Sequence, residues 1–265
     1  MAQNPTPLEE ADRELARAQE LIAAGQLTAA LPALETAVGG FESTGEVFGQ
    51  ILSLKILSEV NRDLGNPTLA LTQVTRAHTL LAEVKPDAEQ LPDFATEVGS
   101  LHAELGDFER STTWYAQGLR GYESLSNAEG QAHNLVALAG LARQAQDEAQ
   151  AQDYLAQAYD LYKEGNHTVQ LMHVRNAQAQ GLLAVGDTDA ARPLLTEALD
   201  LAGELEDHAF LGETYQLLAL VTAQGGDADA AQAHLMRSAE HYAQAGDTDN
   251  EAFVKELLNQ LTGGR

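Results

Sequence analysis

The sequence contains no cysteine, and aromatic residues occupy only 5% of its 265 positions. Without cysteine the chain can form neither a disulfide nor a cysteine-ligated zinc site, and it has no thiol nucleophile. Basic residues are also scarce, because 15 lysines and arginines stand against 40 aspartates and glutamates, for a formal net charge of −25. A surface this acidic is a poor partner for nucleic acid, so we expect no nucleic-acid binding.

Long apolar runs are missing too. No stretch approaches the ~20 consecutive apolar residues of a membrane span, and the first residues lack the basic and apolar regions of a signal peptide. We therefore expect a cytoplasmic protein with no membrane partner. Alanine and leucine together make up about a third of the chain, far above average usage, whereas strand-favouring residues are few. The composition predicts an all-α fold.

The chain is an internal repeat. Six segments begin at a turn residue, here called the anchor, spaced 40, 41, 40, 40 and 40 residues apart: Gly25, Gly65, Gly106, Gln146, Gly186 and Gly226. At seven before, five after and twelve after the anchor, every repeat carries Ala, Gly or Ser. At nine after the anchor every repeat carries a large apolar residue. Two antiparallel helices approach closely only where small side chains meet, and a large residue fills the space one turn away.

The order of small residue, Gly-Asp turn, Ala, large apolar residue and second small residue resembles the tetratricopeptide repeat (TPR). The period of ~40 and a second turn near Gly45, Asn127 or Asp247 are similar to the extended repeats of kinesin light chains, MalT-type regulators and Rap-type peptide receptors. The resemblance implies a right-handed α-α superhelical solenoid of about six helix-turn-helix repeats. We expect 13 helices of roughly 14 to 18 residues and no strands.

The expected organisation is one domain with capped ends. Residues 1–5 form a tail, and residues 6–262 form a single solenoid. Thr6, Pro7 and Glu9 make a capping box at its start. A capping helix at 248–261, with Phe253 in its apolar stripe, shields the last repeat. The repeats are expected at 8–44, 45–85, 86–126, 127–166, 167–207 and 208–247.

Motifs for chemistry are absent. There is no Walker loop, no Gly-x-Ser-x-Gly and no His-Glu-x-x-His. The pairs Asp187/Asp189, Asp227/Asp229 and Asp247/Asp249 follow turns and precede helices, which is typical of helix caps rather than of calcium loops. We therefore predict a non-enzymatic protein with no catalytic residue, no cofactor and no metal site.

The binding prediction rests on the first helix of each pair, which the resemblance places on the concave side. Offsets thirteen, ten, six and three before the anchor share one face of that helix. The polar residues proposed there to bind a peptide or protein are Lys55, Arg62, Arg143, His173, Asn176, Gln180 and Gln216. We expect an acidic side chain or C-terminal carboxylate of the ligand to pair with Arg62 or Arg143.

The leading hypothesis is thus a non-catalytic adaptor that holds a peptide or protein segment in a groove lined by first helices. Two alternatives stay open at this stage. The first is a self-associating structural scaffold, which leaves a homodimer in question. The second is a peptide-sensing regulatory TPR module that acts with a separate effector. The sequence does not identify the partner.

Overall fold

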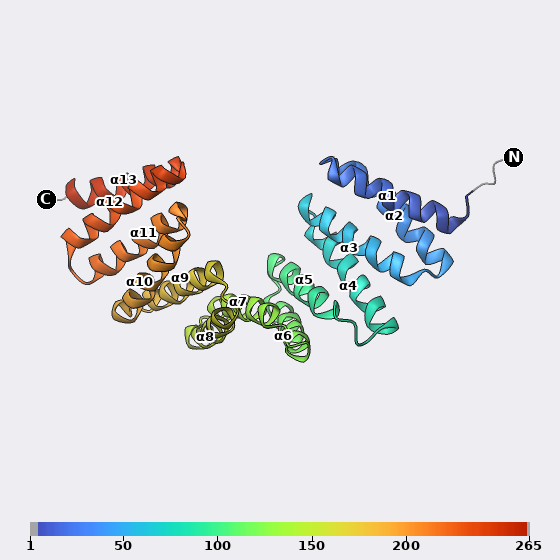
Figure 1. Ribbon diagram of the computed structural model, residues 1–265, viewed down its shortest axis with the longest axis horizontal. Helices are drawn as coiled ribbons and strands as arrows, with labels where there is room; N and C mark the ends of the chain where they lie inside the picture. The colour runs from blue at the N-terminus through green and yellow to red at the C-terminus, as the bar shows by residue number, and fades with distance from the viewer. Residues whose placement is uncertain (1–4, 264–265) are drawn as a thin grey trace. The chain divides into compact units, whose positions relative to one another are not determined.

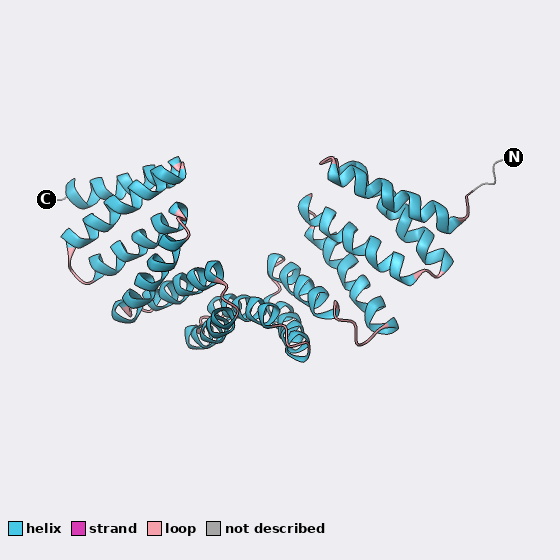
Figure 2. Cartoon of the chain, viewed as in Figure 1, coloured by secondary structure: helices cyan, strands magenta, loops and turns pink. Residues whose placement is uncertain are grey.

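The computed structural model describes residues 5–263. Within that range the chain forms thirteen α-helices and no strand (Figure 2), and their lengths of 14 to 18 residues match the prediction. The predicted tail at 1–5 lies outside the described residues except for Pro5. The helices are α1 (Pro7–Ala23), α2 (Leu27–Thr44), α3 (Val47–Asp63), α4 (Pro67–Val84), α5 (Leu91–Glu104), α6 (Phe108–Ser124), α7 (Ala128–Gln144), α8 (Glu148–Glu164), α9 (Thr168–Ala184), α10 (Thr188–Glu204), α11 (His208–Gln224), α12 (Ala228–Ala245) and α13 (Thr248–Gly263).

Consecutive helices pack in pairs, from α1 with α2 to α11 with α12, and each pair packs on the next within two compact units. The N-terminal unit, up to Asn127, holds α1 to α6, and the C-terminal unit, from Ala128, holds α7 to α13 (Figure 1). The pairs coincide with the six predicted repeats. Each unit is therefore a stack of TPR-like helix pairs, as the repeat pattern predicts. Whether 6–262 behaves as one domain remains a prediction.

The small residues lie where helices meet. All eighteen residues at the three offsets that carry Ala, Gly or Ser are buried: Ala18, Ser58, Gly99, Ala139, Ala179, Ala219, Ala30, Ala70, Ser111, Ala151, Ala191, Ala231, Ala37, Ala77, Gly118, Ala158, Ala198 and Ser238. The large apolar residues nine after each anchor are also buried: Leu34, Val74, Tyr115, Leu155, Leu195 and Leu235. Three of the small hydroxyls use the close approach to bond a neighbouring helix, as Ser111 does by donating to the Gly99 carbonyl at 2.8 Å. The predicted register is confirmed.

Every anchor adopts the left-handed backbone conformation. Five anchors are glycines with φ between 73° and 83°, and the sixth is Gln146 with φ 62°. This conformation reverses the chain between the two helices of a pair, and it costs a residue with a Cβ about 1–2 kcal/mol. Gln146 is therefore the strained member of the set.

Side chains cap the helices as the sequence indicates. Thr6 and Glu9 form the reciprocal capping box at the start of α1. Asp187, Asp227 and Asp247 each accept the backbone N–H three residues on, at 3.0, 3.0 and 3.1 Å. These carboxylates satisfy amides that have no partner within the helix. Their interpretation as helix caps is confirmed.

The terminal helix α13 differs from the prediction at one residue. Val254 is fully buried and Leu257, Leu258 and Leu261 are partly buried, but Phe253 is 52% exposed. The reason is the repeat register. A seventh anchor would fall at position 266, forty after Gly226, which places Phe253 at the offset thirteen before it. That row is exposed in other repeats, at Leu52 and His173. α13 is thus built like a first helix, and Phe253 lies on its first-helix face.

No described helix is both long and apolar enough to cross a membrane.

Candidate functional site

The two arginines that the sequence assigns to ligand binding are engaged within the chain. In the N-terminal unit, Arg62 Nε lies 3.2 Å from Glu104 Oε2 and a terminal nitrogen donates to Ser100 Oγ at 2.8 Å. Arg62 remains partly exposed, so a ligand can still reach its surface. Its charge is nevertheless balanced by Glu104, and an acidic ligand has to compete with that carboxylate.

Arg143, in the C-terminal unit, is held more firmly. Its guanidinium donates to both oxygens of Glu148, at 2.9 and 3.3 Å, and to the Ala177 carbonyl of α9 at 2.7 Å. The pair lies against Gly181, where an added Cβ would overlap the Glu148 carboxylate. Arg143 therefore links two successive repeats, and the structure gives it a packing role that the sequence did not reveal.

Two further proposed residues come from α9. Asn176 is buried, with 3% of its surface exposed, and its Oδ1 accepts from the Thr214 hydroxyl at 3.3 Å. A side chain in that position does not lie on a ligand-accessible face, so its assignment as a surface contact needs correction. Gln180 is exposed and donates from Nε2 to Glu213 Oε1 at 3.1 Å.

The remaining three keep accessible surface. His173 is exposed, and its ring meets Phe210 edge-on with centroids 4.9 Å apart. Lys55 lies 3.7 Å from Glu59 in a half-exposed pair. Gln216 accepts weakly from Tyr242 Oη at 3.4 Å. Burial, together with the carboxylates of Glu213 and Asp247, raises the pKa of Tyr242 to about 12, which keeps this phenol protonated as a donor.

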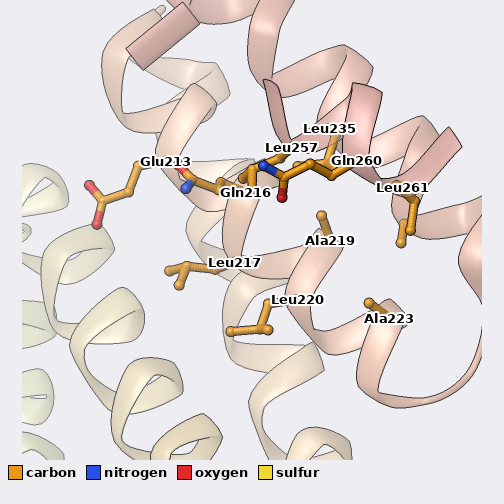
Figure 3. A pocket seen from close by; sticks show the side chains of 11 residues that line it. Glu213, Gln216, Leu217, Ala219, Leu220, Ala223, Leu235, Leu257, Gln260 and Leu261 are labelled. Atoms are coloured by element: carbon orange, nitrogen blue, oxygen red, sulfur yellow. The ribbon is translucent and has the colours of Figure 1, made fainter. Parts of the chain in front are cut away.

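The C-terminal unit holds a groove of about 630 Å³ between α11 and α13, and residues of α12 complete its lining (Figure 3). We call it the α11–α13 groove. It is lined by Glu213, Gln216, Leu217, Ala219, Leu220, Ala223, Ala231, Leu235, Leu257, Gln260 and Leu261. Its lining is mainly apolar, with the two glutamine amides and one carboxylate at its polar positions. A lining of this kind suits side chains of a peptide.

The composition of this groove follows from the repeat register. Glu213, Gln216, Leu220 and Ala223 are the four residues of α11 at the predicted first-helix-face offsets, and all four line the groove. The structure therefore places these offsets on one face in that repeat. Sequence reasoning missed the opposite wall, Leu257, Gln260 and Leu261, because it treated α13 only as a cap. Continuing the 40-residue register into α13 would have placed Gln260 on this face, but not Leu257 or Leu261, which lie at other offsets.

The N-terminal unit holds a smaller groove of about 400 Å³ between α3 and α5. Leu52 and Lys55, which occupy two first-helix-face offsets of α3, line it together with Phe48, Asp93 and Phe94. We call it the α3–α5 groove. Of the seven proposed residues, Lys55 and Gln216 thus line grooves on first helices, and the other five do not line either groove.

A cluster of rings lies between α11 and α12 in the last repeat. Nδ1 of His208 lies 3.2 Å from Nδ1 of His241, whose ring stacks on Tyr215 with centroids 5.5 Å apart. Burial, with a smaller effect of His208, lowers the pKa of His241. In the described part of the chain no group of three or more His, Asp or Glu side chains is arranged to hold a metal ion.

Comparison with known proteins rests on structure, since neither a sequence family nor a curated protein matches the chain. The chain is similar to BtubC (BKLC) from P. vanneervenii, at 18% identity and a TM-score of 0.70, over 89% of this chain and 92% of that one. It is similar to a Rap protein complexed with competence and sporulation factor, at 16% identity and a TM-score of 0.59, over 98% and 77%.

A third similar structure is a signal transduction ATPase with numerous domains that carries a tetratricopeptide repeat sensor, from Pyrococcus horikoshii. Identity is 14% and the TM-score is 0.80, over 98% of this chain and 40% of that one. At these identities the similarities establish the fold. The fold of this chain is the TPR-like helical repeat.

Proposed function

We propose that this protein is a non-catalytic scaffold that binds a peptide or protein segment on the face formed by its first helices. The observation that carries the proposal is the α11–α13 groove, where the predicted first-helix face meets an open, mainly apolar cavity of about 630 Å³. Leu220 leaves 45% of its surface exposed there. An apolar surface with amides among it suits a peptide, whose backbone and side chains need both kinds of contact.

The similar Rap structure supports the proposal, because that protein is complexed with competence and sporulation factor. The similar signalling ATPase supports a second candidate, in which the repeats act as the sensor of a regulatory system with a separate effector. Both candidates use the same face. A cytoplasmic location fits either one and stays a prediction from the sequence.

The test is selection of ligands followed by substitution in the groove. We would select peptides from a random phage-displayed library on the immobilised protein and measure their affinity by fluorescence anisotropy. Leu220→Ala should weaken binding about fivefold, since a half-exposed leucine that a ligand buries contributes about 1 kcal/mol. Met236→Ala is the matched control, because Met236 is 51% exposed on the second helix α12. An equal loss in both variants, or no selected peptide, would contradict the proposal.

A further inference from the structure

The free charge at the α11–α13 groove is negative. Glu213 lines the groove, and among the described residues its carboxylate accepts one hydrogen bond, at Oε1 from Gln180. Among the described residues no ion pair within 4.0 Å includes Glu213. An ionised carboxylate has about four acceptor positions. Most of the binding capacity of this carboxylate is therefore open to a ligand.

No free cation on the same face offsets this charge. Arg143 is the one lysine or arginine of α7, α9 and α11 at the four first-helix-face offsets, and both Glu148 oxygens already bind it. On α13 the same offsets carry Phe253, Glu256, Gln260 and Gly263. An acidic ligand segment would meet repulsion here, contrary to the expectation from the sequence that the arginines receive a carboxylate.

Leucines from two helices form most of the apolar part of the groove. Leu217 and Leu220 of α11 and Leu257 and Leu261 of α13 line it, and Ala219, Ala231 and Leu235 complete the lining. Figure 3 shows Gln216 and Gln260 between these leucines, with Glu213 to one side. The Gln216 Oε1 accepts from Tyr242 and the Gln260 Nε2 donates to Glu256, at 3.4 and 3.2 Å. These bonds leave the Gln216 Nε2 as a donor and the Gln260 Oε1 as an acceptor.

We propose that the α11–α13 groove selects a peptide segment that places an aliphatic or aromatic side chain between Leu220 and Leu257 and a lysine or arginine on Glu213. The two glutamine amides contact the backbone of that segment, one as donor and one as acceptor. This inference rests on the proposed function and adds the charge class of the ligand. Charge complementarity with the unpaired Glu213 distinguishes this ligand from an acidic one.

The experiment uses four pools of fluorescein-labelled nonapeptides and the full chain in 150 mM salt. Three pools contain leucine or phenylalanine together with arginine, with glutamate and with serine, respectively. The fourth pool contains arginine and serine without an apolar residue. Anisotropy titrations should rank the apolar–arginine pool first. Glu213→Gln, which keeps the shape of the side chain, should weaken that pool about tenfold.

Because the whole protein is strongly acidic, a cationic peptide is attracted to it without any specific site. Glu204→Gln is the matched control, since it changes the net charge equally, and Glu204 is exposed at the end of the second helix α10 and does not line the groove. It should leave the affinity within twofold. Circular dichroism checks that both variants remain folded.

Each outcome decides one question. Equal weakening by the two variants, or tighter binding of the apolar–glutamate pool, would overturn the inference. Binding of all apolar pools without a charge preference would leave the scaffold function standing and refute the charge class. If no pool binds, the proposed function fails as well. If sedimentation velocity instead shows a dimer that Leu220→Ala dissociates, the groove holds a second copy and the inference is wrong.

Discussion

The clearest energetic prediction concerns the anchors Gln146 and Gly186, which occupy equivalent turns of the C-terminal unit. The left-handed conformation costs Gln146 about 1–2 kcal/mol, whereas glycine at that position costs about 0.5–1 kcal/mol of chain entropy. Gln146→Gly should therefore stabilise the protein by about 0.5–1 kcal/mol. Gly186→Gln should destabilise it by a similar amount. Nothing lies within 4 Å of an added Cβ at Gly186, so the effect isolates the backbone.

Thermal and urea unfolding followed by circular dichroism at 222 nm measures both changes. For a domain of this size the expected shift in Tm is about 1–4 °C upward for Gln146→Gly and downward for Gly186→Gln. Gln146→Ala is the control, because alanine keeps the Cβ and hence the strain. The reasoning is refuted if alanine stabilises as much as glycine, or if Gly186→Gln leaves the midpoint unchanged.

Three other predictions follow from burial and charge. Ala198→Leu should cost about 1–3 kcal/mol by overpacking a fully buried contact, whereas Ala252→Leu on the exposed side of α13 should be nearly neutral; equal unfolding midpoints would contradict the register. Burial lowers the pKa of His78 and of His241, so at these histidines the unfolded chain binds more protons than the folded one. Their contribution to the free energy of unfolding should therefore be fully present above about pH 6.5 and should decline as the pH falls below that value. His241→Gln should reduce this decline in the free energy of unfolding, measured by urea titrations between pH 7.5 and 5.5. A variant with the same pH dependence as the original protein would contradict the role of His241. At a net charge of −25 the protein should give no gel shift with duplex DNA at physiological salt, and a sub-micromolar, salt-sensitive shift would refute this.

The features that the sequence predicted are those that local pattern controls. The small residue at Ala198, the turn at Gly186 and the cap at Asp187 each depend on backbone geometry that recurs every 40 residues. One repeat therefore predicts the next, and six agreeing repeats leave little freedom for another fold.

The binding face was harder to predict because side-chain pairing has no such period. Arg143 meets Glu148 and Arg62 meets Glu104, and these partners stand at different distances along the chain. Asn176 shares an offset with the accessible Gln216 yet is buried against Thr214. A single sequence gives the offset of each polar residue but not the neighbour that neutralises or covers it.

Gly181 has a consequence for specificity that reaches beyond packing. The absence of a side chain there makes room for the Glu148 carboxylate, and with it for the neutralisation of Arg143. A side chain at this position would overlap the Glu148 carboxylate and crowd the Arg143 guanidinium, so the ion pair could not keep its present geometry. The charge balance of the first-helix face on α7 and α9 is therefore sensitive to a residue that has neither a charge nor a side chain of its own.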